Sequence, residues 1–248
     1  MQEIERQFKF LQVEGSPLSL YVSESLFMPN QTTAAVAAAV SVNPGETGIE
    51  LGAGTGPISV ILASKPELQH LYTTEIVEEQ WKLAQKNIKR YALENKVTAY
   101  RGSIFEPIKQ NHLDLKVDFI VSDISGMSDI PARNLGWYPP AIPTGGADGT
   151  DKIIPLIEQA PQFLKPQGRL YFPIVVNFSD GDKILLAAHR FFNKVKQKSR
   201  TPLPLSGELY NKIKELSSSS GVYVPLEPRG SRGIWHLDVY EAINPKMN

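Results

Sequence analysis

The sequence predicts an α/β fold built around a parallel sheet, and three observations support this. Segments typical of strands and helices alternate five times along the 248 residues, as right-handed crossovers between parallel strands require. A turn with three alternate glycines follows the first of these strands. Polar residues follow four strands, where an open parallel sheet binds ligands. We expect residues 1–45 to form an N-terminal cover and helix, and residues 46–248 to form the main domain.

The N-terminal part is predicted to contain a hairpin and one helix. Residues 8–13 and 18–22 flank a Gly-Ser-Pro turn and are typical of a small hairpin. The alanine-rich run at 34–40 predicts a helix that is capped by Asn30 or by a threonine.

The glycine turn is the first candidate for a ligand site. Gly52, Gly54 and Gly56 let the backbone turn sharply and pass close to a ligand, since a Cβ would fill that space. Glu50 precedes them, and a carboxylate there repels phosphate and suits a cationic ligand. The next helix, residues 57–63, begins with a proline. The turn therefore predicts a nucleoside site, with a tight turn that binds nothing as the alternative.

The second and third strands also end near polar residues. The second predicted strand, residues 70–75, ends at Glu75. Its separation from the glycine turn is close to the ~20 residues typical of nucleoside sites in which a carboxylate at this position binds a ribose diol. An amphipathic helix at 77–91 leads to the third strand, 97–101. Ser103 follows and offers a short polar side chain to a base edge. The alternatives are that Glu75 is a solvated helix cap and that Ser103 is an ordinary loop hydroxyl.

The fourth strand, residues 117–122, is followed directly by Asp123. The carboxyl ends of parallel strands meet at one edge of a sheet, so the four polar positions should face one crevice. These positions are Glu50, Glu75, Ser103 and Asp123.

Residues 126–149 form a long segment rich in proline and glycine. Loops of this length in compact domains are usually functional or disordered. Met127, Trp137 and Tyr138 argue against disorder and for a substrate wall or lid. Anchoring of the loop on the core by the two aromatic residues is the alternative.

The final third departs from simple alternation. Its predicted strands are 169–176, a segment around Val195, 222–224 and 233–242, and its predicted helices are 151–164, 182–192 and 208–216, the last capped by Ser206. Pro155 requires that the first of these helices start near it or kink. The serine tract at 217–220 is predicted to be flexible.

Composition excludes several classes of function. Lysine plus arginine equals aspartate plus glutamate at 26 each, so no overall field favours nucleic acid or acidic membranes. The absence of cysteine excludes disulfides, thiolate catalysis and cysteine-based metal sites. The charged N-terminus and the lack of an apolar run of about 18 residues predict a cytoplasmic protein outside the membrane.

Neither the histidines nor a basic run near residue 195 predicts a binding site. The four histidines are scattered without ligand spacing, so no metal is predicted; they are His70, His112, His189 and His236. A basic run fits a solvated face better than a phosphate contact; it comprises Arg190, Lys194, Lys196, Lys198 and Arg200.

Residues 50–56, Glu75 and residues 101–104 together resemble motifs of the class I S-adenosylmethionine-dependent methyltransferases. The resemblance implies a Rossmann-like, seven-stranded, mostly parallel sheet with helices on both faces and an antiparallel last strand at 233–242. It also implies S-adenosylmethionine as cofactor. The implied cofactor-binding residues are Glu50, Gly52, Gly54, Gly56, Glu75, Ile76, Ser103, Ile104, Asp123 and Thr32.

Within that class the chain looks most like the branch of the release-factor glutamine methyltransferases and small-domain RNA methyltransferases. The segments at 28–33 and 145–151 carry this likeness. That branch has Asn-Pro-Pro-Tyr after the fourth strand, whereas this chain has Asp-Ile-Ser-Gly at 123–126. An ionised aspartate only accepts hydrogen bonds, so it suits an amine, a guanidine or a hydroxyl. The departure argues against methylation of glutamine or of a base by that route.

The sequence therefore predicts methyl transfer to a nitrogen, with oxygen second, of a small metabolite or peptide. Asp123 and Tyr138 are the candidate catalytic residues, and Ser125, Met127, Trp137 and Tyr138 are expected to contact the acceptor. The alternatives are a methyltransferase that acts on RNA or on a translation protein, and a non-catalytic nucleoside-binding domain. A nicotinamide dehydrogenase is a distant further alternative.

Overall fold

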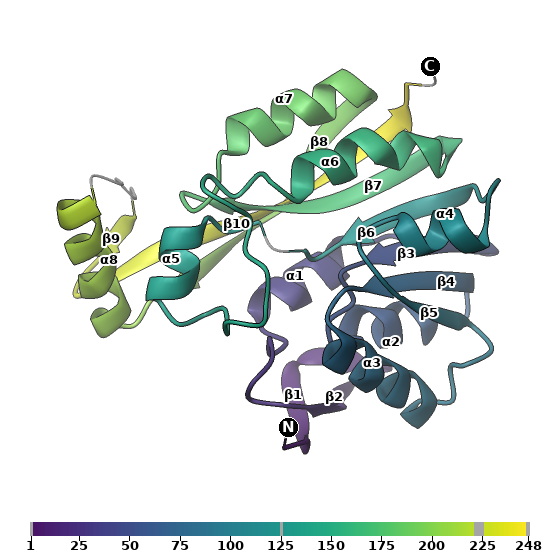
Figure 1. Cartoon of the computed structure of the whole chain (residues 1–248), viewed down its shortest axis with the longest axis horizontal. Helices are drawn as coiled ribbons and strands as arrows, with labels where there is room; N and C mark the ends of the chain where they lie inside the picture. The colour runs from purple at the N-terminus through teal and green to yellow at the C-terminus, as the bar shows by residue number, and fades with distance from the viewer. Residues whose placement is uncertain (1, 125, 221–225, 247–248) are drawn as a thin grey trace.

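The computed structural model describes residues 2–124, 126–220 and 226–246, which fold into one mixed sheet covered by helices (Figure 1). Seven strands cross the sheet in the order β5-β4-β3-β6-β7-β10-β8, and the short β9 (Glu227–Arg229) pairs with β10. The seven are β3 (Glu46–Leu51), β4 (Leu68–Glu75), β5 (Val97–Arg101), β6 (Val117–Ser122), β7 (Leu164–Val176), β8 (Phe192–Pro204) and β10 (Arg232–Pro245). Neighbours from β5 to β7 are parallel, whereas β10 runs antiparallel to β7 and β8. The predicted Rossmann-like sheet with an antiparallel last strand is confirmed.

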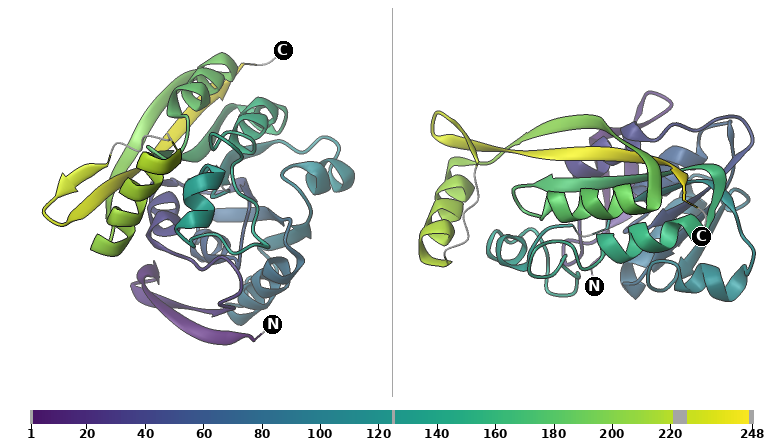
Figure 2. Two further views of the ribbon diagram at one scale, coloured as in Figure 1. Left: turned by 60° about the vertical axis from the view of Figure 1, so that its left-hand side comes forward. Right: turned by 90° about the horizontal axis from the view of Figure 1, so that it is seen from above.

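Helices cover both faces of the sheet, as predicted (Figure 2). One apolar cluster holds buried residues of α1 (Gln31–Ala39), α2 (Pro57–Ala63) and α3 (Glu78–Arg90). A second cluster holds those of α4 (Glu106–Asn111), α6 (Ile153–Gln159) and α7 (Gly181–Phe191). Crossovers on both faces leave the carboxyl ends of the parallel strands open at one edge of the sheet.

The N-terminal hairpin packs on the first of these clusters. Strands β1 (Ile4–Val13) and β2 (Ser16–Val22) are antiparallel, and their inward side chains are buried with those of α1. The Asn30 side chain caps α1 by accepting a 2.7 Å hydrogen bond from the Thr32 N–H. Hairpin, helix and asparagine cap are therefore as the sequence predicts.

Several elements differ from the sequence prediction. The six-residue helix α4 was not predicted, because it is too short to show a helical period. Helix α5 (Asp129–Asn134) interrupts the long segment at 126–149. The helix predicted at 151–164 ends at Gln159, and the short 3-10 turn η1 (Ala160–Gln162) separates it from β7. Pro155 is third in α6, within the first turn, where its missing N–H costs little.

The C-terminal part also differs in extent. The serine tract predicted to be flexible lies within helix α8 (Gly207–Ser220). Strand β8 runs for 13 residues, where the sequence indicated only a strand around Val195. The strand predicted at 222–224 lies outside the described residues. No helix within the described ranges is long and apolar enough to cross a membrane.

Candidate active site

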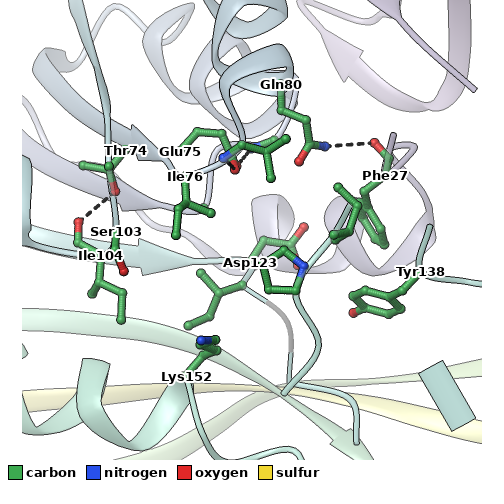
Figure 3. Close-up of a pocket in the computed structure, with 17 residues that line it drawn as sticks. Phe27, Thr74, Glu75, Ile76, Gln80, Ser103, Ile104, Asp123, Tyr138 and Lys152 are labelled. Atoms are coloured by element: carbon green, nitrogen blue, oxygen red, sulfur yellow. Dashed lines mark hydrogen bonds between the residues drawn. The ribbon is translucent and has the colours of Figure 1, made fainter. Parts of the chain in front are cut away.

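A cavity of about 770 Å³, counting space open to solvent, lies at the carboxyl ends of β3, β4, β5 and β6 (Figure 3). Eight of the sequence-predicted residues line it: Gly52, Gly54, Glu75, Ile76, Ser103, Ile104, Asp123 and Tyr138. Figure 3 shows Asp123 between two groups, with Ser103 and Ile104 on one side and Phe27 and Tyr138 on the other.

The glycine turn forms one wall of this cavity. Gly54 has φ +57°, and a Cβ on it would project into open space, with the Gln80 Nε2 atom 3.7 Å away as its nearest neighbour. A Cβ on Gly52 would lie only 2.5 Å from the Ile124 Cγ2 atom. Gly56 does not line the cavity, because it packs against Ala84 of α3. Gly54 is therefore the glycine that leaves room for a ligand.

Glu75 lies at the end of β4 with its carboxylate fixed by the backbone. Its two oxygens accept 2.8 Å hydrogen bonds from the N–H groups of Gly54 and Val77. Burial raises the pKa of Glu75, and these backbone bonds oppose the rise. A carboxylate offers about four acceptor positions, so about two remain for hydroxyl groups of a ligand. Ile76, the next residue, is 52% exposed, which leaves an apolar surface beside these positions.

Ile104 occupies a strained backbone conformation at the cavity wall. Its φ is +45°, which is unusual for a β-branched residue. The Thr74 hydroxyl holds it by donating a 2.9 Å hydrogen bond to the Ile104 carbonyl oxygen. Strain of this kind concentrates at ligand sites, where the surrounding structure over-determines it. Ser103 precedes Ile104 and also lines the cavity.

Comparison with known proteins identifies the ligand class that these walls fit. Residues 28–123 match the family described as methyltransferase small domain. Residues 28–123 therefore carry a domain of the class I S-adenosylmethionine-dependent methyltransferases. S-adenosylmethionine is the cofactor of this class, and the matched range includes 11 of the 17 residues that line the cavity.

Similar proteins were found among both sequences and structures. The release factor glutamine methyltransferase of Thermosynechococcus vestitus is 29% identical over 72% of this chain and 64% of its own length. The ribosomal protein uL3 glutamine methyltransferase of Bradyrhizobium diazoefficiens is 27% identical over 49% of this chain and 38% of its own length. The chain thus spans less than two thirds of either relative. The structure of M. jannaschii TYW2 in complex with AdoMet shares the fold, with a TM-score of 0.56 at 14% identity over 99% of this chain and 89% of that one.

The cavity's residues fit this cofactor. Glu75 retains acceptor positions for ribose hydroxyls, Ile76 and Ile104 offer apolar walls to a purine, and the open side of Gly54 admits the rest of the molecule. Ser103 lines the same cavity, and its contact with a base edge stays a prediction. We therefore expect the adenosine part at the β4 and β5 side, with the methyl group directed toward Asp123.

Glu50 lies behind the glycine turn rather than on the cavity surface. Its side chain is buried and accepts a hydrogen bond from the Ser59 hydroxyl. Burial raises the pKa of Glu50 to about 8, and the charges of Asp123 and Glu75 add to the rise. Its predicted contact with the cofactor is therefore not direct in this structure.

Asp123 stands at the end of β6 and lines the cavity on one side and a second hollow on the other. It is half-buried. Burial raises the pKa of Asp123 to about 7, against the effect of a hydrogen bond with the Thr33 side chain. The carboxyl group can therefore change its protonation near neutral pH.

The second hollow is a groove of about 1570 Å³, again including open space. It shares Phe27, Asp123, Ile124 and Tyr138 with the cofactor cavity, so the two adjoin. Its walls come from residues 24–32, from the segment after β6, and from β7, β8, α8 and β10. We call it the acceptor groove.

The remaining predicted residues are distributed as follows. Thr32, Met127, Trp137 and Tyr138 line the acceptor groove, so Thr32 lies there rather than on the cofactor cavity. Trp137 also packs against Trp235 and Phe178, with ring centroids 5.5 and 5.8 Å apart. Trp137 therefore anchors the loop on the core and also lines the groove, while its contact with a substrate stays a prediction. Ser125 lies outside the described residues.

Sequence reasoning missed several residues of the site. Phe27, Gln80 and Lys152 line the cofactor cavity, and Trp235 lines the groove. The Gln80 amide donates a 3.3 Å hydrogen bond to the Phe27 carbonyl oxygen and so ties α3 to the segment before α1. Phe27 and Lys152 border the segments 28–33 and 145–151 without belonging to them, and Trp235 lies far in sequence from the other residues of the groove. The described residues contain no group of three or more His, Asp or Glu side chains that could hold a metal ion.

Proposed function

We propose that this protein transfers the methyl group of S-adenosylmethionine to a nitrogen atom in a side chain of a protein or peptide. One observation carries the proposal: the cofactor cavity and the acceptor groove meet at Asp123. A methyl donor in the cavity and an acceptor in the groove would approach each other at this carboxyl group.

Methyl transfer depends on the alignment of donor and acceptor more than on a covalent bond to the protein. When bound, S-adenosylmethionine supplies a methyl carbon activated by a positively charged sulfur. In-line attack gains most of its rate from positioning and from exclusion of water. Asp123 would accept a hydrogen bond from the N–H of the acceptor, orient its lone pair, and take its proton. Phe27 and Tyr138, which are 5.4 Å apart between ring centroids, would shield this point.

The relatives favour a protein acceptor over the free metabolite that the sequence suggested first. Their names assign them to release factors and to a ribosomal protein. The groove is compatible with such an acceptor, since residues of several elements between 24 and 237 line it. It is also open, as a site for a segment of a larger partner must be.

The basic run gives little support to an RNA acceptor. Lys196 and Lys198 on β8 face Glu241 of β10, with nitrogen–oxygen distances of 2.7 and 3.8 Å. Arg200 forms two 2.8 Å hydrogen bonds with Asp238. Cations that are already paired within the sheet release fewer counterions on binding a phosphate backbone.

The test uses an Asp123→Asn variant of the whole chain. With radiolabelled cofactor and fractionated cell extract, we expect turnover to fall by about 100-fold, the usual contribution of one acid–base group. Cofactor affinity measured by calorimetry should stay unchanged. Asp114→Asn, at an exposed position, is the matched control. Full turnover by Asp123→Asn would refute the role of Asp123, and cofactor binding without any labelled product would favour a non-catalytic domain.

A further inference from the structure

The acceptor groove has an acidic lining. Among its described lining residues the charged side chains are Glu24 and Asp123, and Asp123 also lines the cofactor cavity. No lysine, arginine or histidine of the described residues lines it. Two carboxylates without a basic partner favour a positively charged guest.

Aromatic rings supply a second feature that favours a cation. Phe27, Trp137, Tyr138 and Trp235 all line the groove. Trp137 packs on Trp235 with 5.5 Å between ring centroids, and Phe27 packs on Tyr138 at 5.4 Å. The faces of such rings attract ammonium groups, and Trp does so most strongly.

Most of the remaining lining is apolar, apart from Asn30, Gln31 and Thr32. It includes Leu26, Met28, Met127, Val175, Leu203 and Leu237. A long hydrocarbon stem with a charged head suits such a surface, because the stem packs on apolar atoms while the head reaches polar groups.

We propose that the acceptor groove binds a lysine side chain of a partner protein, with its amine at Asp123 and its stem along the apolar wall. This rests on the proposed function and narrows its substrate class. Lysine fits better than arginine, because an ammonium group gives up a proton far more readily than a guanidinium group. It fits better than glutamine, because the ionised form of Asp123 attracts a positively charged ammonium group and has no such attraction for a neutral amide.

The transfer balances as follows. The lysine ammonium group gives one proton to the Asp123 carboxylate, and its nitrogen regains a lone pair. That nitrogen forms a bond to the methyl carbon while the carbon–sulfur bond breaks and its electron pair goes to sulfur. The products are a methylammonium group and S-adenosylhomocysteine, and Asp123 passes its proton to water.

The experiment gives the whole chain and S-adenosylmethionine a set of matched acetyl-capped peptides. The central residue is lysine, acetyl-lysine, arginine or glutamine, and leucine and phenylalanine flank it. Mass spectrometry reads the methylated residue. We expect the lysine peptide to react at least about tenfold faster than the others, as loss of one charge-assisted contact implies. Faster reaction of the glutamine or arginine peptide would overturn the proposal.

A variant tests the acidic lining itself. Glu24→Gln changes an exposed side chain, so folding should be retained. It should raise the KM for the lysine peptide by a few-fold and leave cofactor affinity unchanged, and Glu94→Gln, exposed elsewhere, should change neither. Equal KM values for all three proteins would contradict the charge argument.

An experiment on cell extract distinguishes failure of this proposal from failure of the proposed function on which it rests. Cell extract is labelled by the enzyme and digested, and the modified residue is mapped. Methyl-lysine supports the proposal, whereas methylation of glutamine or arginine refutes it and leaves the proposed function intact. No methylation at all, with cofactor bound, refutes both.

Discussion

The two halves of the site are built in different ways. The cofactor cavity draws its walls mainly from successive strand ends between residues 52 and 124, and backbone hydrogen bonds fix its acid, Glu75. The acceptor groove collects residues from near both ends of the chain and holds them by aromatic packing. Local backbone geometry therefore fixes the cofactor half, whereas the acceptor half depends on tertiary contacts. Substitutions should therefore affect the two halves separately.

The largest expected effect concerns the buried acid behind the cofactor half. The pKa of Glu50 is raised from 4.5 to about 8, so the folded protein keeps a proton that the unfolded chain loses as pH rises between these values. The free energy of unfolding should fall by up to about 1.4 kcal/mol per pH unit across this window. Glu50→Gln should remove that slope in urea-unfolding midpoints, apart from a smaller part from Asp123.

Glu67→Gln, at an exposed position, should leave the slope unchanged. A wild-type protein whose stability does not fall between these pH values would show that Glu50 is ionised when folded.

A second prediction separates cofactor binding from acceptor binding. Gly54→Asp places a carboxylate in the cavity at a φ that aspartate tolerates. We expect cofactor affinity to drop by about 100-fold or more, because the side chain occupies ligand space. Gly45→Asp has a similar positive φ, open surroundings and no place in the cavity. Equal calorimetric affinities of the two variants would contradict the position of the cofactor.

A third prediction concerns Glu75. The two carboxylate oxygens of Glu75 accept hydrogen bonds from the N–H groups of Gly54 and Val77, and Glu75→Gln leaves only one such oxygen. Cofactor affinity should fall by about tenfold, since one charge-assisted bond is lost. Calorimetry with Glu79→Gln, an exposed neighbour, supplies the reference. An unaltered affinity would remove Glu75 from the ribose site.

The smallest effect is expected on the groove side. Trp137→Leu removes one aromatic wall but keeps an apolar side chain on the loop. The KM for the methyl acceptor should rise by a few-fold, the scale of one cation–π contact. Cofactor affinity should not move, and Phe10→Leu on the exposed face of β1 should change neither value. A loss of cofactor affinity in Trp137→Leu would show that the two halves are coupled.

The cofactor half could be predicted from the sequence, and physics explains why. Glu75 ends β4, Asp123 directly follows β6, and Gly54 lies in the turn after β3, so the rule that parallel strands end at one edge brings them together. What could not be predicted there was the position of Glu50, since its bond with Ser59 directs it away from the cavity surface.

The acceptor half could be predicted only in part. Trp137 stood out because it lies in a long loop, but its partner Trp235 lies in β10, an element with no motif. Helix α4 was missed because six residues show less than two helical turns. The pairing of Arg200 with Asp238 depends on the register of two distant strands, which no local pattern contains.

The position of β10 bears on how the molecule is made. β10 lies between β7 and β8, although it follows both along the chain. As the ribosome extends the chain, β7 and β8 emerge before the strand that joins them, and their facing edges stay unpaired until residue 232 and beyond have left the tunnel. The cofactor cavity, whose lining ends at Lys152, is already synthesised by then. A nascent chain would thus acquire the walls that hold its methyl donor before those that hold its acceptor.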